Sequence, residues 1–182
     1  SERLVGAGPR QVGEDGVKAG RPGRVDRVGG TEKSQNSGHI SYGRDNHHAM
    51  VKLRAEKIER AANDFPEATL DSGEAGNDMV VVGWGSTYGS IKQAVARSRA
   101  KGRSIAHLHI RNIWPLPRGL RTLLESFGHI MVPEMNNGQL DALLRAVHQV
   151  DAQGFQKIAG QPFRIAELEA EIERRFDGMA KA

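Results

Sequence analysis

Short apolar runs separated by segments of helical spacing fill the chain from residue 79 onward. Runs at 79–82, Ile105–Ile110 and 129–135 have the length and continuity of buried strands, and a short fourth strand is expected near 157–159. Between and after these runs, apolar side chains recur every three or four residues, which predicts helices. The four stripes are Ile91, Ala94, Val95 and Ser98; Leu120, Leu123, Leu124 and Phe127; Leu140, Leu143, Leu144 and Val147; and Ile165, Leu168, Ile172 and Phe176. Alternating strands and helices predict an α/β fold, a three-layer domain with a parallel sheet between helices.

The first 78 residues differ from the rest of the chain in glycine content, charge and apolar periodicity. Residues 1–28 contain six glycines and show no apolar periodicity, so they are expected to be a disordered or non-native arm. Residues 29–78 are expected to be a linker with one helix, an amphipathic segment at 45–62 with Asp45 as its N-cap. Within it, residues 63–78 carry five acidic and no basic side chains, typical of an exposed linker. The α/β domain itself is expected over residues 79–182.

The amino-acid composition excludes several kinds of chemistry and partner. The chain has no cysteine, which excludes disulfides, thiolate nucleophiles and iron–sulfur ligation within it. Its net charge of +4 comes from residues 1–62, with 12 basic and 8 acidic side chains, and the basic residues lack the aromatic interleaving of a nucleic-acid surface. No apolar run is long enough to cross a membrane, so no membrane partner is expected, and the absence of cysteine makes a cytoplasmic location the default expectation. The absence of an initiator Met suggests a fragment or a processed chain.

Several residue groups could carry chemistry, and each also has a purely structural interpretation. The glycine-rich turn at 83–89 differs from a dinucleotide-binding fingerprint by one residue and is interpreted first as a sharp strand-to-helix turn. His107 and His109 share one face of a strand and no third ligand is evident, so hydrogen bonds to neighbouring backbone or helix termini are favoured over a metal site. Glu134 ends a strand and is expected to organise its loop. No catalytic, cofactor-binding or metal-binding residue is assigned.

Two further groups are interpreted from their positions. The adjacent His47 and His48 point about 100° apart on a helix and do not form a ligand pair. A basic run occupies the end of the helix predicted after the turn and is interpreted as a solvated helix end, with a docking patch for an acidic partner as the alternative. Its members are Arg97, Arg99, Lys101 and Arg103.

Several separate motifs occur in an order that resembles the alpha subunit of 2-oxoacid:ferredoxin oxidoreductases, and most closely its 2-oxoglutarate (2-oxoglutarate synthase) branch. The resemblance covers about residues 29–176. It rests on Gly29-Gly30-Thr31-Glu32-Lys33, Asn46-His47, Met50, Arg54, the stretch 82–89, His107-Leu108-His109, Pro115-Leu116-Pro117, the stretch 132–140 and Gly160-Gln161-Pro162-Phe163. Thr31 and Lys33 stand where the family usually has an apolar residue and a histidine.

The resemblance implies a complex that uses thiamine diphosphate, Mg²⁺ and iron–sulfur clusters to convert a 2-oxoacid and coenzyme A into acyl-CoA, CO2 and reduced ferredoxin. It implies that this chain is a domain similar to the transketolase C-terminal domain, with a scaffolding and subunit-contact role. Its partners would be the beta subunit and the remaining alpha-subunit domains, with no cofactor held by this chain. The isolated chain is then expected to be inactive. Two alternatives stay open: an autonomous nucleotide-binding module, and a domain of a transketolase-like enzyme acting on sugars.

The loops that follow the predicted strands hold large side chains that are otherwise scarce in this chain. Trp84, Tyr88, Trp114 and Met135 all lie in these loops, although aromatic residues make up only 5% of the sequence. Because parallel strands place the loops at their carboxyl ends along one edge, these side chains are expected to form a contact surface. The alternative is that Trp84 and Trp114 fold back as lids over their own helices.

Overall fold

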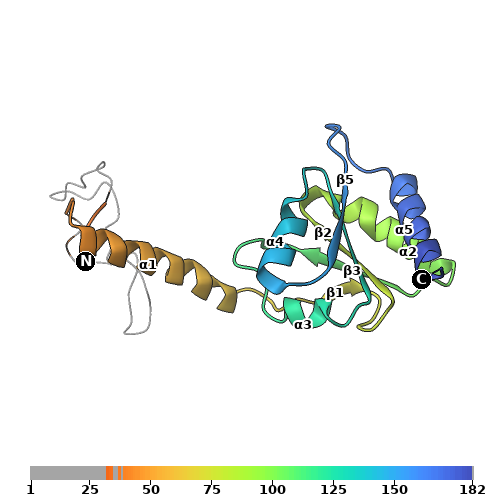
Figure 1. Cartoon of the computed structure of the whole chain (residues 1–182), viewed down its shortest axis with the longest axis horizontal. Coiled ribbons are helices and arrows are strands. Elements are labelled where there is room, and N and C mark those ends of the chain that lie inside the picture. Colours follow the sequence, from red (N-terminus) through yellow and green to blue (C-terminus); the bar gives the residue numbers. More distant parts are fainter. Residues whose placement is uncertain (1–31, 35–36, 38, 182) are drawn as a thin grey trace, which may run out of the picture. The chain divides into compact units, whose positions relative to one another are not determined.

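The computed structural model describes residues 32–34, 37 and 39–181 and divides into two compact units, residues 1–64 and 65–182. Figure 1 traces both units. The arm expected at residues 1–28 lies outside the described residues. None of the described helices has the length and apolar character needed to span a membrane.

The first unit contains the helix α1 (Arg44–Arg60), followed by the 3-10 turn η1 (Ala61–Asn63). This confirms the helix expected at 45–62. The expected cap is wrong, because the helix begins at Arg44 with Gly43 as its N-cap and without a side-chain cap bond. Ahead of it, Lys33 and Ile40 form an antiparallel bridge.

The second unit is built on a five-stranded sheet in the order β1-β3-β2-β4-β5. Its strands are β1 (Leu70–Ser72), β2 (Met79–Trp84), β3 (Ile105–Ile110), β4 (His129–Glu134) and β5 (Ala152–Gln156). The pairs β2–β3, β2–β4 and β4–β5 are parallel, and only β1 runs antiparallel, beside β3. The sheet is therefore mostly parallel, with one antiparallel strand at an edge.

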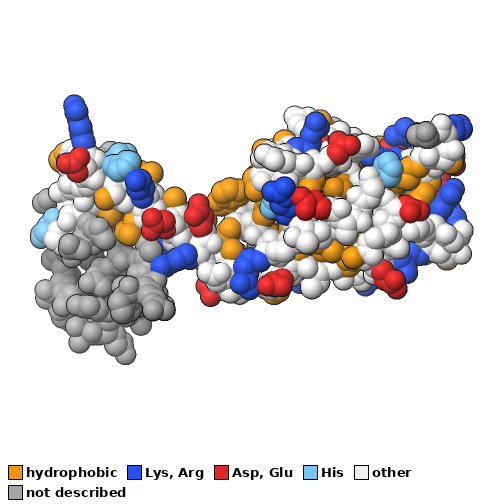
Figure 2. Space-filling model, turned by 60° about the horizontal axis from the view of Figure 1, so that its bottom comes forward, with side chains coloured by type: hydrophobic (Ala, Val, Ile, Leu, Met, Phe, Trp, Pro, Cys, Tyr) orange, Lys and Arg blue, Asp and Glu red, His pale blue; other side chains and the backbone are white. Residues whose placement is uncertain are grey.

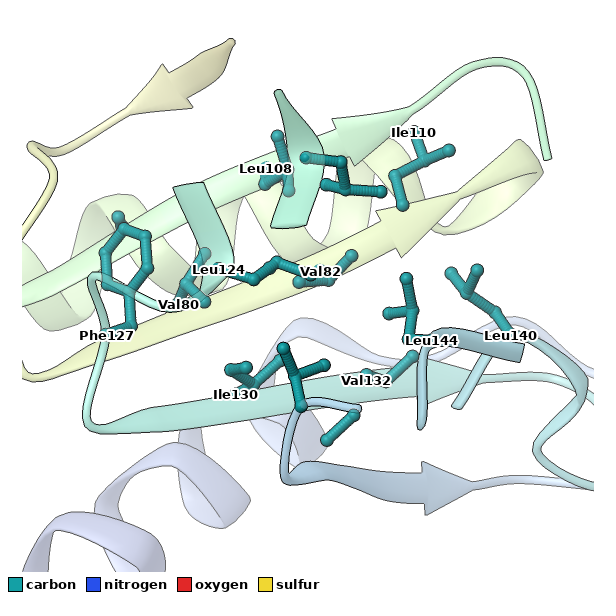
Figure 3. Close-up of a cluster of buried hydrophobic side chains, with 14 residues drawn as sticks. Val80, Val82, Leu108, Ile110, Leu124, Phe127, Ile130, Val132, Leu140 and Leu144 are labelled. Carbon is teal, nitrogen blue, oxygen red and sulfur yellow. The ribbon is translucent and has the colours of Figure 1, made fainter. Parts of the chain in front are cut away.

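Helices cover both faces of this sheet, which confirms the three-layer α/β fold. On one face lie α2 (Tyr88–Ala100) and α5 (Ile165–Met179), and on the other lie α3 (Leu120–Leu124) and α4 (Gln139–His148) (Figure 1). The strand β2 contributes Val80 and Val82 to one apolar cluster, and Met79 and Val81 to the other. Figure 3 shows the first cluster, in which leucines of α3 and α4 pack against β2, β3 and β4. Burial on both faces explains why β2 is a continuous apolar run rather than an alternating one.

Two strands differ from the sequence prediction. The segment 63–78, interpreted as an exposed linker, supplies β1, whose residues Leu70 and Ser72 pair with Leu108 and His107. The last strand is β5, which ends at Gln156, so the strand expected near 157–159 is misplaced. The apolar residue behind that prediction, Ile158, is 67% exposed.

The basic run at the end of α2 is not simply solvated, which corrects the first interpretation. Arg103 binds Glu173 of α5 at 2.6 Å, and Arg97 binds Glu169 of the same helix at 3.3 Å. The Arg103 guanidinium also lies 5.0 Å from the ring centre of Phe176. These cations hold α2 against α5. The visible face of this unit accordingly carries interspersed charges of both signs (Figure 2).

Candidate functional site

The carboxyl end of the sheet contains a crevice between β2 and β4. The chain leaves β2 toward β3 on one side, whereas β4 lies on the other side, so the loops after β2 and β4 diverge. Ligand sites of open α/β sheets lie at such a switch point. The crevice here measures about 220 Å3 and is lined by Trp84, Gly85, Ser86, Thr87, Met135 and Asn136.

Glu134 is buried next to this crevice and holds the residues around it in place. Its side chain is fully buried, and Oε1 accepts hydrogen bonds from Trp84 Nε1 at 3.1 Å and from the Leu140 backbone N–H at 2.9 Å. Oε2 accepts from the Asp141 N–H at 3.0 Å. The carboxylate thus ties β2 to the first turn of α4, where a negative charge is favourable. The prediction that Glu134 organises its loop is confirmed.

A second side chain completes this cap, and sequence reasoning did not identify it. Asn136 Oδ1 accepts from the N–H groups of Gly138 at 2.8 Å and Gln139 at 3.1 Å. Four consecutive N–H groups at the start of α4 are therefore satisfied by Asn136 and Glu134. An Asn two residues ahead of a glycine and a helix is the signal that could have been used. This helix terminus has no N–H of those four left for an anion.

Asp141, in the first turn of α4, has a pKa that is shifted by its surroundings. Desolvation raises the pKa of Asp141, and the charge of Glu134 raises it further, whereas Arg145 opposes the shift. A carboxylate with a raised pKa can act in proton transfer when it faces a substrate. Asp141 is not among the residues that line the crevice, so the raised pKa does not mark an acid–base group of that site.

Thr87 closes the glycine-rich turn at 83–89. Thr87 Oγ1 accepts from the Trp84 N–H at 3.2 Å and donates to the Trp84 carbonyl at 2.8 Å. A Cβ added at Gly83 would lie 2.5 Å from Ile91 Cδ1, so this glycine lets α2 pack closely on β2. Gly85 has a φ of +56°, a conformation that suits glycine. These contacts agree with the structural interpretation of the turn.

His107 and His109 form a ring cluster with Tyr88 instead of the expected hydrogen bonds. The ring centre of Tyr88 lies 5.5 Å from that of His107 and 4.8 Å from that of His109. Both ring nitrogens of the buried His107, and Nδ1 of His109, lack hydrogen-bond partners among the described residues. Burial lowers the pKa of His107 to about 4 and also lowers that of His109. The backbone bonding expected for His107 is therefore wrong.

The first unit contains a polar cluster that joins residues far apart in sequence. Glu32 accepts from Arg54 Nη1 at 2.7 Å, and its Oε2 lies 2.7 Å from His47 Nδ1. The bond to Arg54 lowers the pKa of Glu32 to about 2. In addition, Asn46 Nδ2 donates to the Lys33 carbonyl at 3.0 Å. The motif residues at 32–33 and 46–54 thus hold the segment ahead of α1 against that helix. Sequence reasoning did not predict this role for His47.

The two tryptophans behave differently. Trp84 is half-buried and donates to Glu134, but it packs on the cluster formed with α3 and α4 and not on α2, the helix that follows its own strand, so the interpretation as a lid over its own helix is wrong for it. Trp114 is 59% exposed, in the loop after β3, and does not fold back in this way. The large side chains expected at the carboxyl edge are thus divided between internal packing and exposure.

Comparison with known proteins identifies the family. Residues 77–168 match the model of the pyruvate:ferredoxin oxidoreductase core domain II. The chain belongs to this family.

Relatives of this core domain II are parts of larger proteins. The chain is 38% identical over 149 residues to the 2-oxoglutarate oxidoreductase subunit KorA of Mycobacterium tuberculosis, covering 82% of this chain and 22% of the relative. It is 32% identical over 89 residues to the alpha subunit of 2-oxoacid:ferredoxin oxidoreductase 1 of Aeropyrum pernix, covering 48% of this chain and 14% of that protein. The chain therefore spans about a fifth, or less, of these relatives.

A solved structure shows the same fold. The 2-oxoglutarate:ferredoxin oxidoreductase of Magnetococcus marinus, with 2-oxoglutarate, coenzyme A and succinyl-CoA bound, superposes with a TM-score of 0.75 at 23% identity. The match covers 86% of this chain and 27% of the Magnetococcus chain. At this identity the likeness concerns the architecture of core domain II.

The residues of this core domain II do not fit the metal cofactors that the resemblance implies for the complex. An iron–sulfur cluster needs cysteine thiolates, and the sequence has none. Among the described residues there is no group of three or more His, Asp or Glu side chains that could hold a metal ion. His107 and His109 are two potential ligands, and the described part of the chain places no third one beside them.

Proposed function

We propose that this chain is the C-terminal structural and subunit-contact domain of the alpha subunit of a thiamine diphosphate-dependent 2-oxoacid:ferredoxin oxidoreductase. The substrate of the complex would be 2-oxoglutarate, and its products succinyl-CoA, CO2 and reduced ferredoxin. Thiamine diphosphate, Mg²⁺ and the iron–sulfur cluster would be held by other domains or by the beta subunit. The observation that carries this proposal is the 38% identity to the M. tuberculosis KorA subunit over 149 residues.

The geometry of the domain supports a structural role. Three polar side chains at the carboxyl edge are used within the domain, as Glu134 and Asn136 cap α4 and Thr87 closes the turn after β2. A general acid or base needs a polar atom within hydrogen-bond reach of the substrate, and a nucleophile needs a neighbouring base. The inward bonding of these residues favours positioning of neighbouring parts over chemistry at this edge.

The test is a segment exchange in the M. tuberculosis enzyme. The segment of its KorA subunit that matches this chain is replaced by the corresponding residues of this chain, and the subunit is produced together with its partner. Reduction of methyl viologen is then measured with 2-oxoglutarate, coenzyme A and thiamine diphosphate. We expect the exchanged enzyme to be active and the isolated chain to show no turnover above background.

Two controls define what the result means. A KorA subunit with the matching segment deleted should be inactive, and the unmodified enzyme sets the reference rate. Turnover by the isolated chain would contradict the proposal, and so would an exchanged enzyme that assembles but stays inactive. Parallel assays with pyruvate and with a ketose phosphate test the choice of substrate. Activity with only the ketose phosphate would favour the sugar-enzyme alternative, and nucleotide binding by the isolated chain would favour the autonomous module.

A further inference from the structure

The carboxyl edge of the sheet presents a surface with unusual composition. We define the carboxyl-edge surface by the four segments at the carboxyl ends of β2, β3, β4 and β5, namely residues 83–89, 111–119, 135–138 and 157–164. Because these four strands are parallel within one sheet, all four loops lie along the same edge. The segments 83–89 and 135–138 contain no charged residue, and the four charged residues of the two outer loops stand only near the ends of those loops: Arg111, Arg118, Lys157 and Arg164.

This depletion of charge coincides with exposed apolar side chains. Trp114 is 59% exposed in the second loop, and Ile158 is 67% exposed in the fourth. Between them lies the crevice of about 220 Å3, lined in part by the half-buried Trp84 and Met135. Both tryptophans of the chain are therefore at this edge. The fully buried centres of protein interfaces are depleted in charge and enriched in aromatic residues and Met, and the central segments 83–89 and 135–138 have this composition.

The crevice gives this surface a receptor for one side chain. Its floor is fixed, because Glu134 holds both the indole of Trp84 and the first turn of α4. Energetically dominant interface residues are large side chains that enter such preformed pockets, surrounded by contacts that exclude water. An apolar side chain entering between Trp84 and Met135 would lie between the loop after β3, which carries Trp114, and the loop after β5, which carries Ile158, in the order of the strands.

The occupant follows from the length of the relatives. The match with the M. tuberculosis subunit covers 22% of its length, so most of that protein lies outside the matched segment. A domain held within a larger subunit must bury part of its surface against the remainder. The carboxyl-edge surface has cations only near the ends of its outer loops and no acid, so it fits a partner whose contact face is apolar at its centre and is not basic at its rim.

We propose that the carboxyl-edge surface is the face by which this domain docks onto the rest of the same enzyme. The partner presents an apolar surface and inserts one apolar side chain into the crevice beside Trp84. This inference rests on the proposed function, because the partner is the remaining part of the alpha subunit with its associated subunit.

The absence of cysteine from the chain allows a direct footprint of this face. A single thiol is introduced as Ile158→Cys, and in a matched control as Val147→Cys. Val147 is also an exposed apolar residue, at 43%, but it lies near the far end of α4. The rate of maleimide labelling is measured by mass spectrometry of the corresponding peptide, in the isolated full chain and in the exchanged M. tuberculosis enzyme. We expect assembly to slow labelling at 158 by at least about tenfold, as burial in an interface requires, and to leave position 147 unchanged.

A second substitution tests the energetics of the same face. Trp114→Ala removes an exposed ring, so the folded domain should keep its melting temperature. In the assembled enzyme, it should weaken docking by about 30-fold, the effect of truncating a central aromatic anchor, and labelling at 158 should accelerate toward the rate of the isolated chain.

The outcomes separate this inference from the proposed function. An active exchanged enzyme in which position 158 labels as fast as in the isolated chain overturns the docking surface and leaves the function standing. Slowed labelling at 147 alone assigns docking to α4 and also overturns it. Protection at 158 that is already present in the isolated chain and disappears on dilution identifies a second copy as the occupant, against the proposal. An exchanged enzyme that assembles but is inactive contradicts the function itself.

Discussion

Replacing His107 with phenylalanine should remove a specific part of the acid sensitivity of the α/β unit. His107 is fully buried on β3, and neither of its ring nitrogens has a hydrogen-bond partner within the described part of the chain. Burial lowers its pKa from 6.5 to about 4. His109 and Lys92 lower it further, and the carboxylate of Asp71 opposes the shift. Phenylalanine keeps a planar ring of comparable size against Tyr88 but cannot be protonated.

The sign of the effect follows from proton binding. Between pH 6.5 and 4 the unfolded chain protonates this histidine whereas the folded domain keeps it neutral, so acid stabilises the unfolded state. Stability contributed by the neutral histidine is therefore present above pH 6.5 and lost as the pH falls toward 4. At about pH 5 the loss relative to about pH 7.5 amounts to ~2 kcal/mol, given 1.36 kcal/mol for each unit of pKa difference. His107→Phe should lack this loss.

Urea unfolding followed by tryptophan fluorescence measures the effect, because both tryptophans lie in the α/β unit. The quantity of interest is the difference in unfolding free energy between the wild type and His107→Phe at each pH. A difference in packing energy between histidine and phenylalanine that does not depend on pH cancels when the values at about pH 5 and about pH 7.5 are subtracted. His129→Gln, which removes an exposed imidazole at the start of β4, should retain the wild-type pH dependence. Parallel pH profiles for the wild type and His107→Phe would refute the reasoning, because they would mean that burial does not keep His107 neutral.

Two other substitutions test the packing of the carboxyl edge by urea unfolding. Glu134→Gln should destabilise the domain by about 2 kcal/mol, because a fully buried carboxylate accepts three hydrogen bonds there, and an unchanged midpoint would contradict its bracing role. Gly83→Ala should cost about 1–3 kcal/mol, since the added Cβ would lie 2.5 Å from Ile91 Cδ1. Gly89→Ala is its matched control: no described atom outside its own helix backbone and chain neighbours lies within 4 Å of the added Cβ, so the substitution should be neutral or stabilise α2 by up to about 1 kcal/mol. Equal effects at both glycines would show that close packing at Gly83 is unimportant.

The central strands and their helices could be predicted because the apolar pattern of the sequence indicates which residues are buried, and glycine and polar residues mark where each element ends. The strand β3 coincides with the predicted Ile105–Ile110, and β4 ends one residue before the predicted boundary. Continuous apolar runs bounded by glycine and polar residues leave few other arrangements in a sheet covered on both faces. The role of Glu134 could also be anticipated, since a carboxylate at a strand end just before a helix is placed to accept from the first turn.

The edge strands could not be predicted, for a different reason. The strand β1 is only three residues long, within an acidic segment, and it exists through its pairing with β3. Likewise, β5 has no regular alternation, and its pairing with β4 selects Ala152–Gln156 rather than the more apolar neighbour at Ile158. Tertiary pairing decides such weak patterns, and a single sequence does not encode the partner. The same holds for Glu32 and Arg54, whose contact spans 22 residues.

At the carboxyl edge, several polar side chains bond within the domain while large apolar side chains are exposed, and the two features are related. In many open α/β sheets, the loops at this edge keep polar groups free for ligands. Here Glu134 and Asn136 are used to cap α4, and Thr87 bonds to the backbone of its own turn. With these polar groups directed inward, the large apolar side chains Trp114 and Ile158 are left exposed at the same edge. Removing Glu134 or Asn136 would free N–H groups at the start of α4 for a ligand. The loss of Glu134 would also release the indole of Trp84, which lines the crevice that an apolar partner needs. A domain of this construction is therefore better suited to hold a neighbour in place than to bind a small polar substrate.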